Sequence, residues 1–196
     1  MSEVQPNWLL CGGIGSGKSV VRELFEDHGL STIDADSVGH EVIQPNGPGV
    51  AEVSTAWPEV VVDGEIDRKK LGAIVFSNPD ALTRLEKISH PHIFQLIEER
   101  LSNLDPPVVV EIPLLTQPFS GSWRRIVVDA TDELRLERAV ARGMEEEQVR
   151  RRMASQPSRR EWLAAADLVV PNNGTIEALE EATGRIVNFV RGAVGD

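Results

Sequence analysis

The 196-residue chain has the length of one domain with a sizeable core. Its 41% hydrophobic and 26% charged content is ordinary for a globular protein, and no apolar run is long enough to span a bilayer. The net charge of −11 argues against long stretches of nucleic acid as a partner. The N-terminal residues lack the basic start of a signal peptide, and the single cysteine, Cys11, excludes a disulfide framework and a cysteine-based zinc site. We therefore expect a soluble cytoplasmic protein, a monomer or weak homo-oligomer, with neither a nucleic acid nor a membrane as its partner.

The first predicted element is a short buried strand over residues 8–11, and a glycine-rich loop follows it directly. Residues 12–19 read Gly-Gly-Ile-Gly-Ser-Gly-Lys-Ser and fit the phosphate-binding pattern G-x-x-x-x-G-K-[ST]. Glycines let successive backbone N–H groups turn toward an anion, and a helix beginning near Lys18 adds its positive end to the same place. The pattern predicts a nucleoside triphosphate as ligand, with Lys18 at the β- and γ-phosphates and the Ser19 hydroxyl at a phosphate-bound Mg²⁺.

The alternative for these residues is a glycine-rich turn that binds nothing. An amphipathic helix after the loop argues against it, because Val21, Leu24 and Phe25 recur at helical spacing. Gly29 then supplies a C-terminal stop for that helix. The succession of strand, loop and helix therefore favours the phosphate-binding interpretation.

Short apolar segments then alternate with helical ones in the way that builds a parallel α/β sheet. The further predicted strands lie at residues 30–33, 108–110, 125–128 and 167–170. About seventy residues of helical character separate the second strand from the third, which is too many for a loop. We expect a single domain over residues 1–196 with a helical insertion over residues 37–104.

Capping residues predict where several helices begin. Asp67 is placed to cap one helix of the insertion, and Asn78 with Pro79 is placed to open the next. Pro91 is expected to kink or end that second helix. A closing helix is predicted from Thr175 onward.

Acidic residues follow two of the predicted strands. Asp34 and Asp36 come after the second strand, where extended geometry would point both carboxylates toward the phosphate loop. Asp36 could then accept a proton from an attacking hydroxyl or hold Mg²⁺ through water, or it could only cap a helix beginning at Ser37. Glu111 follows the third strand, where an acid either orients Mg²⁺, as in phosphate-loop enzymes, or only solvates the strand end.

Basic residues are grouped, although the chain as a whole is acidic. Arg135, Arg138 and Arg142 lie on one helical face, and five further arginines lie between residues 150 and 160. Such a run is most often a solvated helix face. The alternative is a local set of cations that meets phosphates.

Together these residues resemble the dephospho-coenzyme A kinase family from residue 10 to about residue 179. Besides the loop, the shared landmarks are Ile-Asp-Ala-Asp at 33–36, Asp-Gly-Glu-Ile-Asp-Arg at 63–68, Ile-Val-Phe at 74–76, His-Pro-His-Ile at 90–93, Glu-Ile-Pro-Leu-Leu at 111–115, Leu-Glu-Arg at 136–138, Arg-Met-Ala-Ser-Gln at 152–156 and Asn-Asn-Gly at 172–174. Their order and spacing agree with the family. Thr116 and Gln117 depart from it, since the family often has an aromatic residue and then an acid at this place.

The resemblance implies a P-loop NTPase-type three-layer α/β fold with a parallel sheet, a helical insertion that helps hold the acceptor, and an arginine-bearing lid at about residues 138–165. It implies ATP-dependent phosphorylation of the 3′-hydroxyl of dephospho-coenzyme A, the last step of coenzyme A synthesis, with Mg²⁺ as the required ion.

The resemblance also implies roles for individual residues. The implied catalytic residues are Lys18, Asp36 as general base and Arg142. The implied ATP-binding residues are Gly13, Ile14, Gly15, Ser16, Gly17, Lys18, Ser19, Val20, Arg142 and Asn172. The implied acceptor-binding residues are Asp36, His90, Glu111, Pro113 and Leu114. Ser19 would bind Mg²⁺ directly, and Asp36 and Glu111 are candidates to hold it through water.

Two other functions remain open from the sequence. One is a phosphate-loop kinase for a nucleoside, sugar or shikimate-like acceptor, in which the insertion would be a different acceptor lid. The other is a non-catalytic nucleotide-binding regulator, which the presence of Lys18, Ser19 and Asp36 disfavours.

Overall fold

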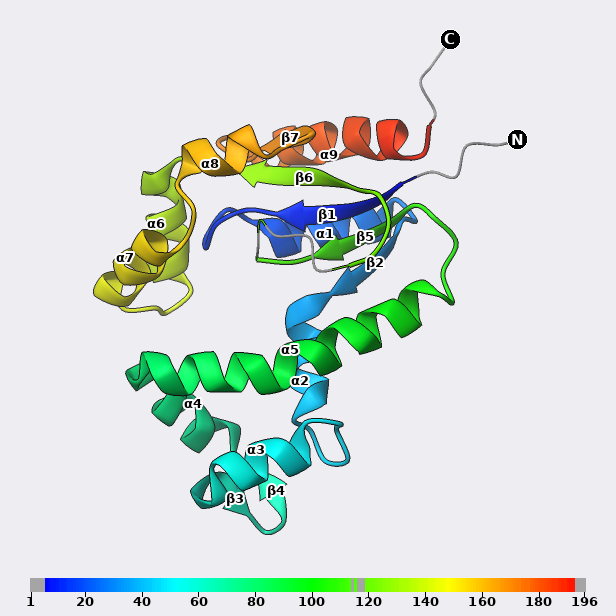
Figure 1. Cartoon of the computed structure of the whole chain (residues 1–196). Coiled ribbons are helices and arrows are strands. Elements are labelled where there is room, and N and C mark those ends of the chain that lie inside the picture. The colour runs from blue at the N-terminus through cyan, green and yellow to red at the C-terminus, as the bar shows by residue number, and fades with distance from the viewer. Residues whose placement is uncertain (1–5, 114, 116–118, 193–196) are drawn as a thin grey trace. The chain divides into compact units, whose positions relative to one another are not determined.

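The computed structural model describes residues 6–113, 115 and 119–192, which divide into two compact units. The core unit comprises Met1–Ile33 and Leu104–Asp196, and the helical unit comprises Asp34–Asn103. Within the described residues the core unit carries a five-stranded sheet in the order β2-β5-β1-β6-β7 (Figure 1). Its strands are β1 Asn7–Cys11, β2 Ser31–Asp34, β5 Val108–Glu111, β6 Trp123–Asp129 and β7 Leu168–Pro171. The α/β fold with a parallel sheet is therefore confirmed.

Strand β1 lies at the centre of this sheet and is buried on both faces. It pairs in parallel with β5 on one side and β6 on the other, so that Leu9 lies between Val110 and Arg125. Strand β6 in turn pairs in parallel with β7. The helices of the core unit are α1 Lys18–Asp27, α6 Asp132–Ala141, α7 Glu146–Ser155, α8 Arg159–Ala164 and α9 Ile176–Val190. Among the described residues, no helix is both long and apolar enough to cross a membrane.

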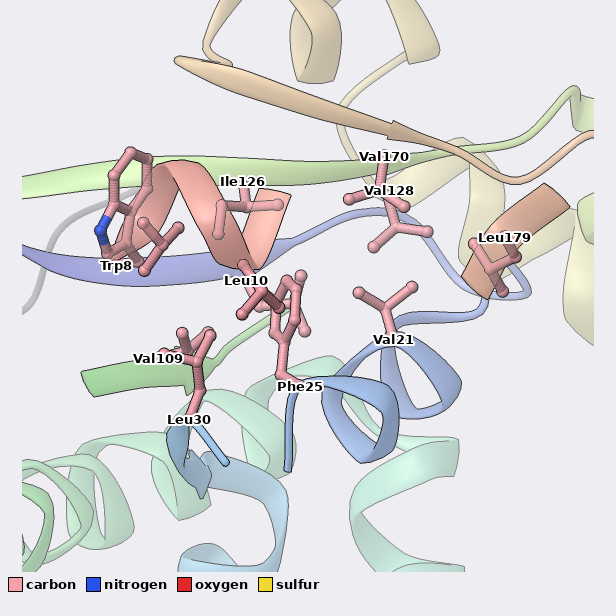
Figure 2. Packing of buried hydrophobic residues seen from close by; sticks show 12 residues of the cluster. Trp8, Leu10, Val21, Phe25, Leu30, Val109, Ile126, Val128, Val170 and Leu179 are labelled. Atoms are coloured by element: carbon pink, nitrogen blue, oxygen red, sulfur yellow. The ribbon is translucent and has the colours of Figure 1, made fainter. Parts of the chain in front are cut away.

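One face of the sheet is covered by α1 and α9. Figure 2 shows Trp8 and Leu10 of β1 directed toward the same apolar cluster as Val21 and Phe25 of α1. Leu179 of α9 joins the cluster, as do apolar side chains of β5, β6 and β7. Because α1 begins at the phosphate loop and packs here along its apolar side, this core fixes the direction in which the helix N-terminus points.

The helical unit has its own elements and its own core. The elements are α2 Ala35–Val42, α3 Val50–Ala56, a 3-10 turn at Pro58–Val60, β3 Val61–Val62, β4 Glu65–Ile66, α4 Arg68–Ser77 and α5 Pro79–Leu101. Asp67 accepts hydrogen bonds from two backbone N–H groups at the start of α4, and Asn78 does the same at the start of α5. Both predicted caps are thus confirmed.

Two expectations for this unit were incomplete or wrong. The sequence predicts only helical character here, yet β3 and β4 form a short hairpin whose turn residues Asp63 and Gly64 have φ of 51° and 85°. Asp-Gly is a favoured pair for such a turn, so this signal was present in the sequence. Pro91 does not end α5, which continues through it to Leu101.

The thiol of Cys11 is predicted to be unreactive in the native protein. Cys11 is fully buried at the end of β1, and burial raises the pKa of its thiol from 9.0 to about 12. The thiolate is the reactive form, so a thiol reagent at about pH 8 should label the folded chain far more slowly than the chain in guanidinium. Rapid labelling without denaturant would show that the end of β1 opens readily.

Candidate functional site

The functional side chains of the core unit gather at the carboxyl ends of its parallel strands. The loop begins one residue after β1, and Glu111 is the last residue of β5, in register with Leu10. Asp129 is the last residue of β6, and Asn172 follows the end of β7. This is the edge at which open α/β sheets bind ligands.

Glycines set the path of the loop itself. Gly12, Gly15 and Gly17 have φ of 147°, 75° and 95°, a range that residues with a Cβ rarely adopt. Lys18, the first residue of α1, donates from Nζ to the carbonyl oxygen of Gly12 at 3.0 Å. The ammonium group is therefore folded back over the loop, where it would meet a bound phosphate.

Ser19 and Glu111 form the oxygen-rich part of the site. The Ser19 hydroxyl donates to Oε1 of Glu111 at 3.1 Å, and Nε of Arg22 donates to Oε2 at 3.1 Å. Glu111 is buried, at 7% exposure. A hydroxyl beside a carboxylate at a phosphate loop is the donor set that Mg²⁺ prefers, so these residues fit a magnesium ion brought with the nucleotide.

Asn172 supports the loop from the end of β7. Its Nδ2 donates to the carbonyl oxygen of Ser16 at 2.8 Å, and its own backbone oxygen accepts from Nη1 of Arg138 at 3.0 Å. A Cβ on Gly17 would lie 2.3 Å from Asn172 Nδ2, so glycine is required there for this contact as well as for its φ. Asn172 is buried, at 7% exposure.

Arg135 and Gln156 contact the tip of the loop. Nε of Arg135 donates to the carbonyl oxygen of Ile14 at 3.0 Å, and the N–H of Ile14 donates to Oε1 of Gln156 at 2.8 Å. Arg135 is 4% exposed and also bonds Asp132 at 2.8 Å. The face of α6 that carries Arg135 is therefore packed on the loop, and at this position the solvated-face interpretation is wrong.

The arginines after Arg138 fall into two groups, one exposed to solvent and one paired at the strand ends. Arg150 and Arg151 are exposed and pair with glutamates one turn earlier on α7, as expected for a solvated helix face. Arg142 is exposed at the C-terminal end of α6. Arg159 makes a two-bond ion pair with Asp129, at 2.7 and 2.8 Å.

Comparison with known proteins identifies the family. The dephospho-CoA kinase family model matches residues 9–178. A dephospho-CoA kinase of Streptomyces avermitilis is 41% identical over 184 residues, covering 90% of each chain, and one of Hydrogenovibrio crunogenus is 39% identical over 180 residues, covering 88% of this chain and 91% of its own. The chain belongs to the dephospho-CoA kinase family. The solved dephospho-CoA kinase of Campylobacter jejuni, at 27% identity, has a TM-score of 0.70 and covers 96% of this chain and 98% of its own.

The structure places Asp36 in a different backbone conformation from the one that we expected. Strand β2 ends at Asp34, and α2 begins at Ala35, so Asp36 lies in the first helical turn and not in extended chain. Asp34 is the cap: its carboxylate accepts from the Asp36 N–H at 2.9 Å and from the Ser37 hydroxyl at 2.6 Å. The proposed alternative, in which Asp36 caps a helix that begins at Ser37, is therefore wrong.

The remaining predicted site residues are distributed as follows. His90 lies in α5 of the helical unit with its ring 5.5 Å from that of Phe94. Pro113 lies two residues beyond β5 in the core unit. Leu114, Thr116 and Gln117 lie outside the described residues.

Sequence reasoning missed three contacts at the site of this family member. In the sequence Gln156 stands only within a family landmark and Arg135 only within a basic face, and Asp129 belongs to no motif. The local signal for Asp129 is its place at a strand end, two residues before the Thr131 that caps α6.

The ion pair of Asp129 predicts a pH-dependent contribution to stability. The hydrogen bonds from the Arg159 guanidinium hold the pKa of Asp129 below its ordinary 3.8. A carboxyl with a lowered native pKa stabilises the fold above its unfolded pKa, and this contribution is lost as the pH falls through the native value. Asp129→Asn should therefore lower the melting temperature by a few degrees at about pH 7, and the difference from wild type should shrink below about pH 4.

Thermal unfolding of both proteins across this pH range measures the effect. Asp105→Asn, at an exposed position of the same unit, is the matched control and should follow wild type throughout. A constant difference between Asp129→Asn and wild type at all pH values would contradict the assignment.

Proposed function

We propose that this chain transfers the γ-phosphoryl group of ATP to the 3′-hydroxyl of the ribose of dephospho-CoA, which yields coenzyme A and ADP. The observation that carries the proposal is the phosphate loop, with Lys18 bonded to its Gly12 carbonyl and Ser19 bonded to Glu111. The chain that holds this loop belongs to the dephospho-CoA kinase family. In the reaction the 3′-oxygen forms a bond to the γ-phosphorus, the bond to the β–γ bridging oxygen breaks, and the hydroxyl proton goes to a base.

The loop and α1 are assigned to the triphosphate. Backbone N–H groups between Gly13 and Val20 would bind the phosphate oxygens, except those of Ile14 and Ser16, which are bonded to Gln156 and to the Gly13 carbonyl. Lys18 would exchange its bond to the Gly12 carbonyl for the β- and γ-phosphates. The segment around Asn172 is assigned to the adenine. The carboxamide and the backbone of Asn172 are both engaged, by Ser16, Arg138 and Asp129, so this residue would hold the segment in position beside the base.

Ser19 and Glu111 are assigned to Mg²⁺. The Ser19 oxygen would bind the ion directly, and Glu111, held also by Arg22, would orient its water shell. When bound, the ion neutralises charge on the transferring phosphoryl group.

Asp36 is assigned as the general base. It is exposed in the first turn of α2, and its own carboxylate makes none of the capping contacts, which Asp34 provides. A carboxylate in this state can accept the proton of the acceptor's 3′-hydroxyl as the bond to phosphorus forms. His90 of the helical unit, with Glu111, Pro113 and Leu114, is assigned to the acceptor.

Arg142 is assigned to the phosphates in the closed state of a lid over residues 138–165. It is exposed at the end of α6, so its guanidinium is accessible to a ligand. Charge spreads over the γ-phosphoryl oxygens in the loose transition state, and a cation that arrives on closure would stabilise this charge and exclude water.

The proposed activity is tested by an acceptor panel. With ATP and Mg²⁺, the purified chain should convert dephospho-CoA to coenzyme A, and nucleosides, sugars and shikimate should give little ADP. Coupled detection of ADP and chromatography of coenzyme A measure both products. Turnover of another acceptor alone, or no ATP turnover at all, would overturn the proposal.

Asp36→Asn tests the base. The variant keeps the size of the side chain and leaves the Asp34 cap intact but removes the proton acceptor, so kcat should fall by about 10² to 10⁴ with little change in melting temperature. Titration with Mg²⁺ is the control for a metal role, since a residue that holds the water shell should be partly rescued by excess ion. Rescue would make Asp36 a magnesium residue, and a normal kcat would remove it from the mechanism.

A further inference from the structure

The peptide groups on both sides of Ile14 are held by side chains from outside the phosphate loop. Gln156, at the C-terminal end of α7, accepts the N–H of Ile14 at 2.8 Å. Arg135, on α6, donates from Nε to the carbonyl oxygen of the same residue at 3.0 Å. The two side chains also meet each other, with Nη2 of Arg135 3.5 Å from Oε1 of Gln156.

These two bonds orient consecutive peptide planes. In a trans peptide the C=O and the following N–H point in opposite directions, so the bond from Arg135 to the Ile14 carbonyl turns the N–H of Gly15 away from Arg135. By the same argument, the bond from Ile14 N–H to Gln156 turns the Gly13 carbonyl away from Gln156. That carbonyl accepts the N–H of Ser16 at 3.2 Å, which closes the turn of the loop.

Arg135 packs so closely on the loop that Gly13 and Gly15 have no room for a Cβ. A Cβ on Gly13 would lie 1.9 Å from Nη2 of Arg135, and one on Gly15 would lie 2.1 Å from the Arg135 backbone oxygen. Both are variable positions of the phosphate-binding pattern, so the pattern alone does not require glycine at either. At Gly13 the constraint is the guanidinium group, and at Gly15 the backbone of α6 adds to the positive φ.

We propose that Gln156 and Arg135 are positioning residues that preset the phosphate loop for the triphosphate. They fix the orientation of the loop N–H groups in the free protein. These groups therefore do not need to reorient when the nucleotide binds. The inference rests on the proposed function only in taking ATP as the ligand, and it concerns nucleotide binding and not the acceptor or the base.

Gln156→Glu gives the sharpest test. Glutamate keeps an oxygen acceptor for the Ile14 N–H and gains attraction to Arg135, so a residue with only a structural role would tolerate it. The new negative charge lies one hydrogen bond from the loop backbone at Ile14, and if that backbone is set for the phosphates, the charge repels the triphosphate. The Kd for ATP should then rise about tenfold or more, with the melting temperature unchanged or raised.

Gln148→Glu is the matched control, because it makes the same charge change at an exposed position of the same helix. It should leave the Kd for ATP at the wild-type value. An equal rise in both variants would mean that the general charge of α7 matters and would overturn the proposal. An unchanged Kd in Gln156→Glu would also overturn it.

Removal of the contacts should act in the same direction. Gln156→Ala loses the acceptor and Arg135→Lys loses the guanidinium fork, and each should raise the Kd for ATP about three- to tenfold, which is the size of one hydrogen bond. In turnover, the KM for ATP should rise while the KM for dephospho-CoA stays at the wild-type value. A rise in both KM values to the same extent would indicate a general loss of structure and would contradict a positioning role.

Calorimetry of ATP binding without any acceptor separates this proposal from the proposed function. If the chain binds ATP but does not phosphorylate dephospho-CoA, the proposed function fails while the ranking of Kd values still tests Gln156 and Arg135. If turnover is normal and the Kd values do not change, the proposed function stands and the positioning role fails.

Discussion

The backbone path of the phosphate loop is the constraint on which the rest of the core unit depends. The loop takes positive φ at Gly12, Gly15 and Gly17, and side chains or backbone from other elements approach each of these glycines to within 2.8 Å of a would-be Cβ. A glycine loop left alone would be costly to hold in one conformation, because glycine loses more backbone freedom than any other residue. The surrounding contacts supply the order that the loop sequence lacks.

The same contacts explain how an acidic chain can be arranged to receive a triphosphate. Arg135, Arg138 and Arg159 all bind groups of the protein itself: the Ile14 carbonyl, the Asn172 carbonyl and the Asp129 carboxylate. These three arginines hold parts of the site in place, and the cations assigned to the phosphates are Lys18 and Arg142. Sequence counting of basic residues cannot separate these two uses, since both kinds of arginine lie in one cluster.

Features that depend on neighbours in sequence were predictable, and features that depend on distant ones were not. The loop pattern, the caps Asp67 and Asn78 and the strands are each encoded within a few residues, and the structure confirms them. The expected burial is found in β1 and β5, whereas β2 and β7, at the two edges of the sheet, are partly exposed. The cap of α2 was assigned to the wrong residue. Asp34 and Asp36 can both cap a helix, and the local sequence does not show whether the helix begins at Ala35 or at Ser37. The roles of the lid, Arg142 and Asp36 in catalysis stay predictions.

The contacts that hold the loop join residues very far apart in sequence. Arg135, Gln156 and Asn172 lie 121, 142 and 156 positions from the loop residues they bond. The loop is therefore held in this shape only when α6, α7 and β7 are in place beside it, so the anion site belongs to the folded core and not to the loop segment. A nucleotide that binds this shape alone must stabilise the whole C-terminal half of the core unit by mass action. The stability of that half and its affinity for the triphosphate thus depend on the same set of hydrogen bonds.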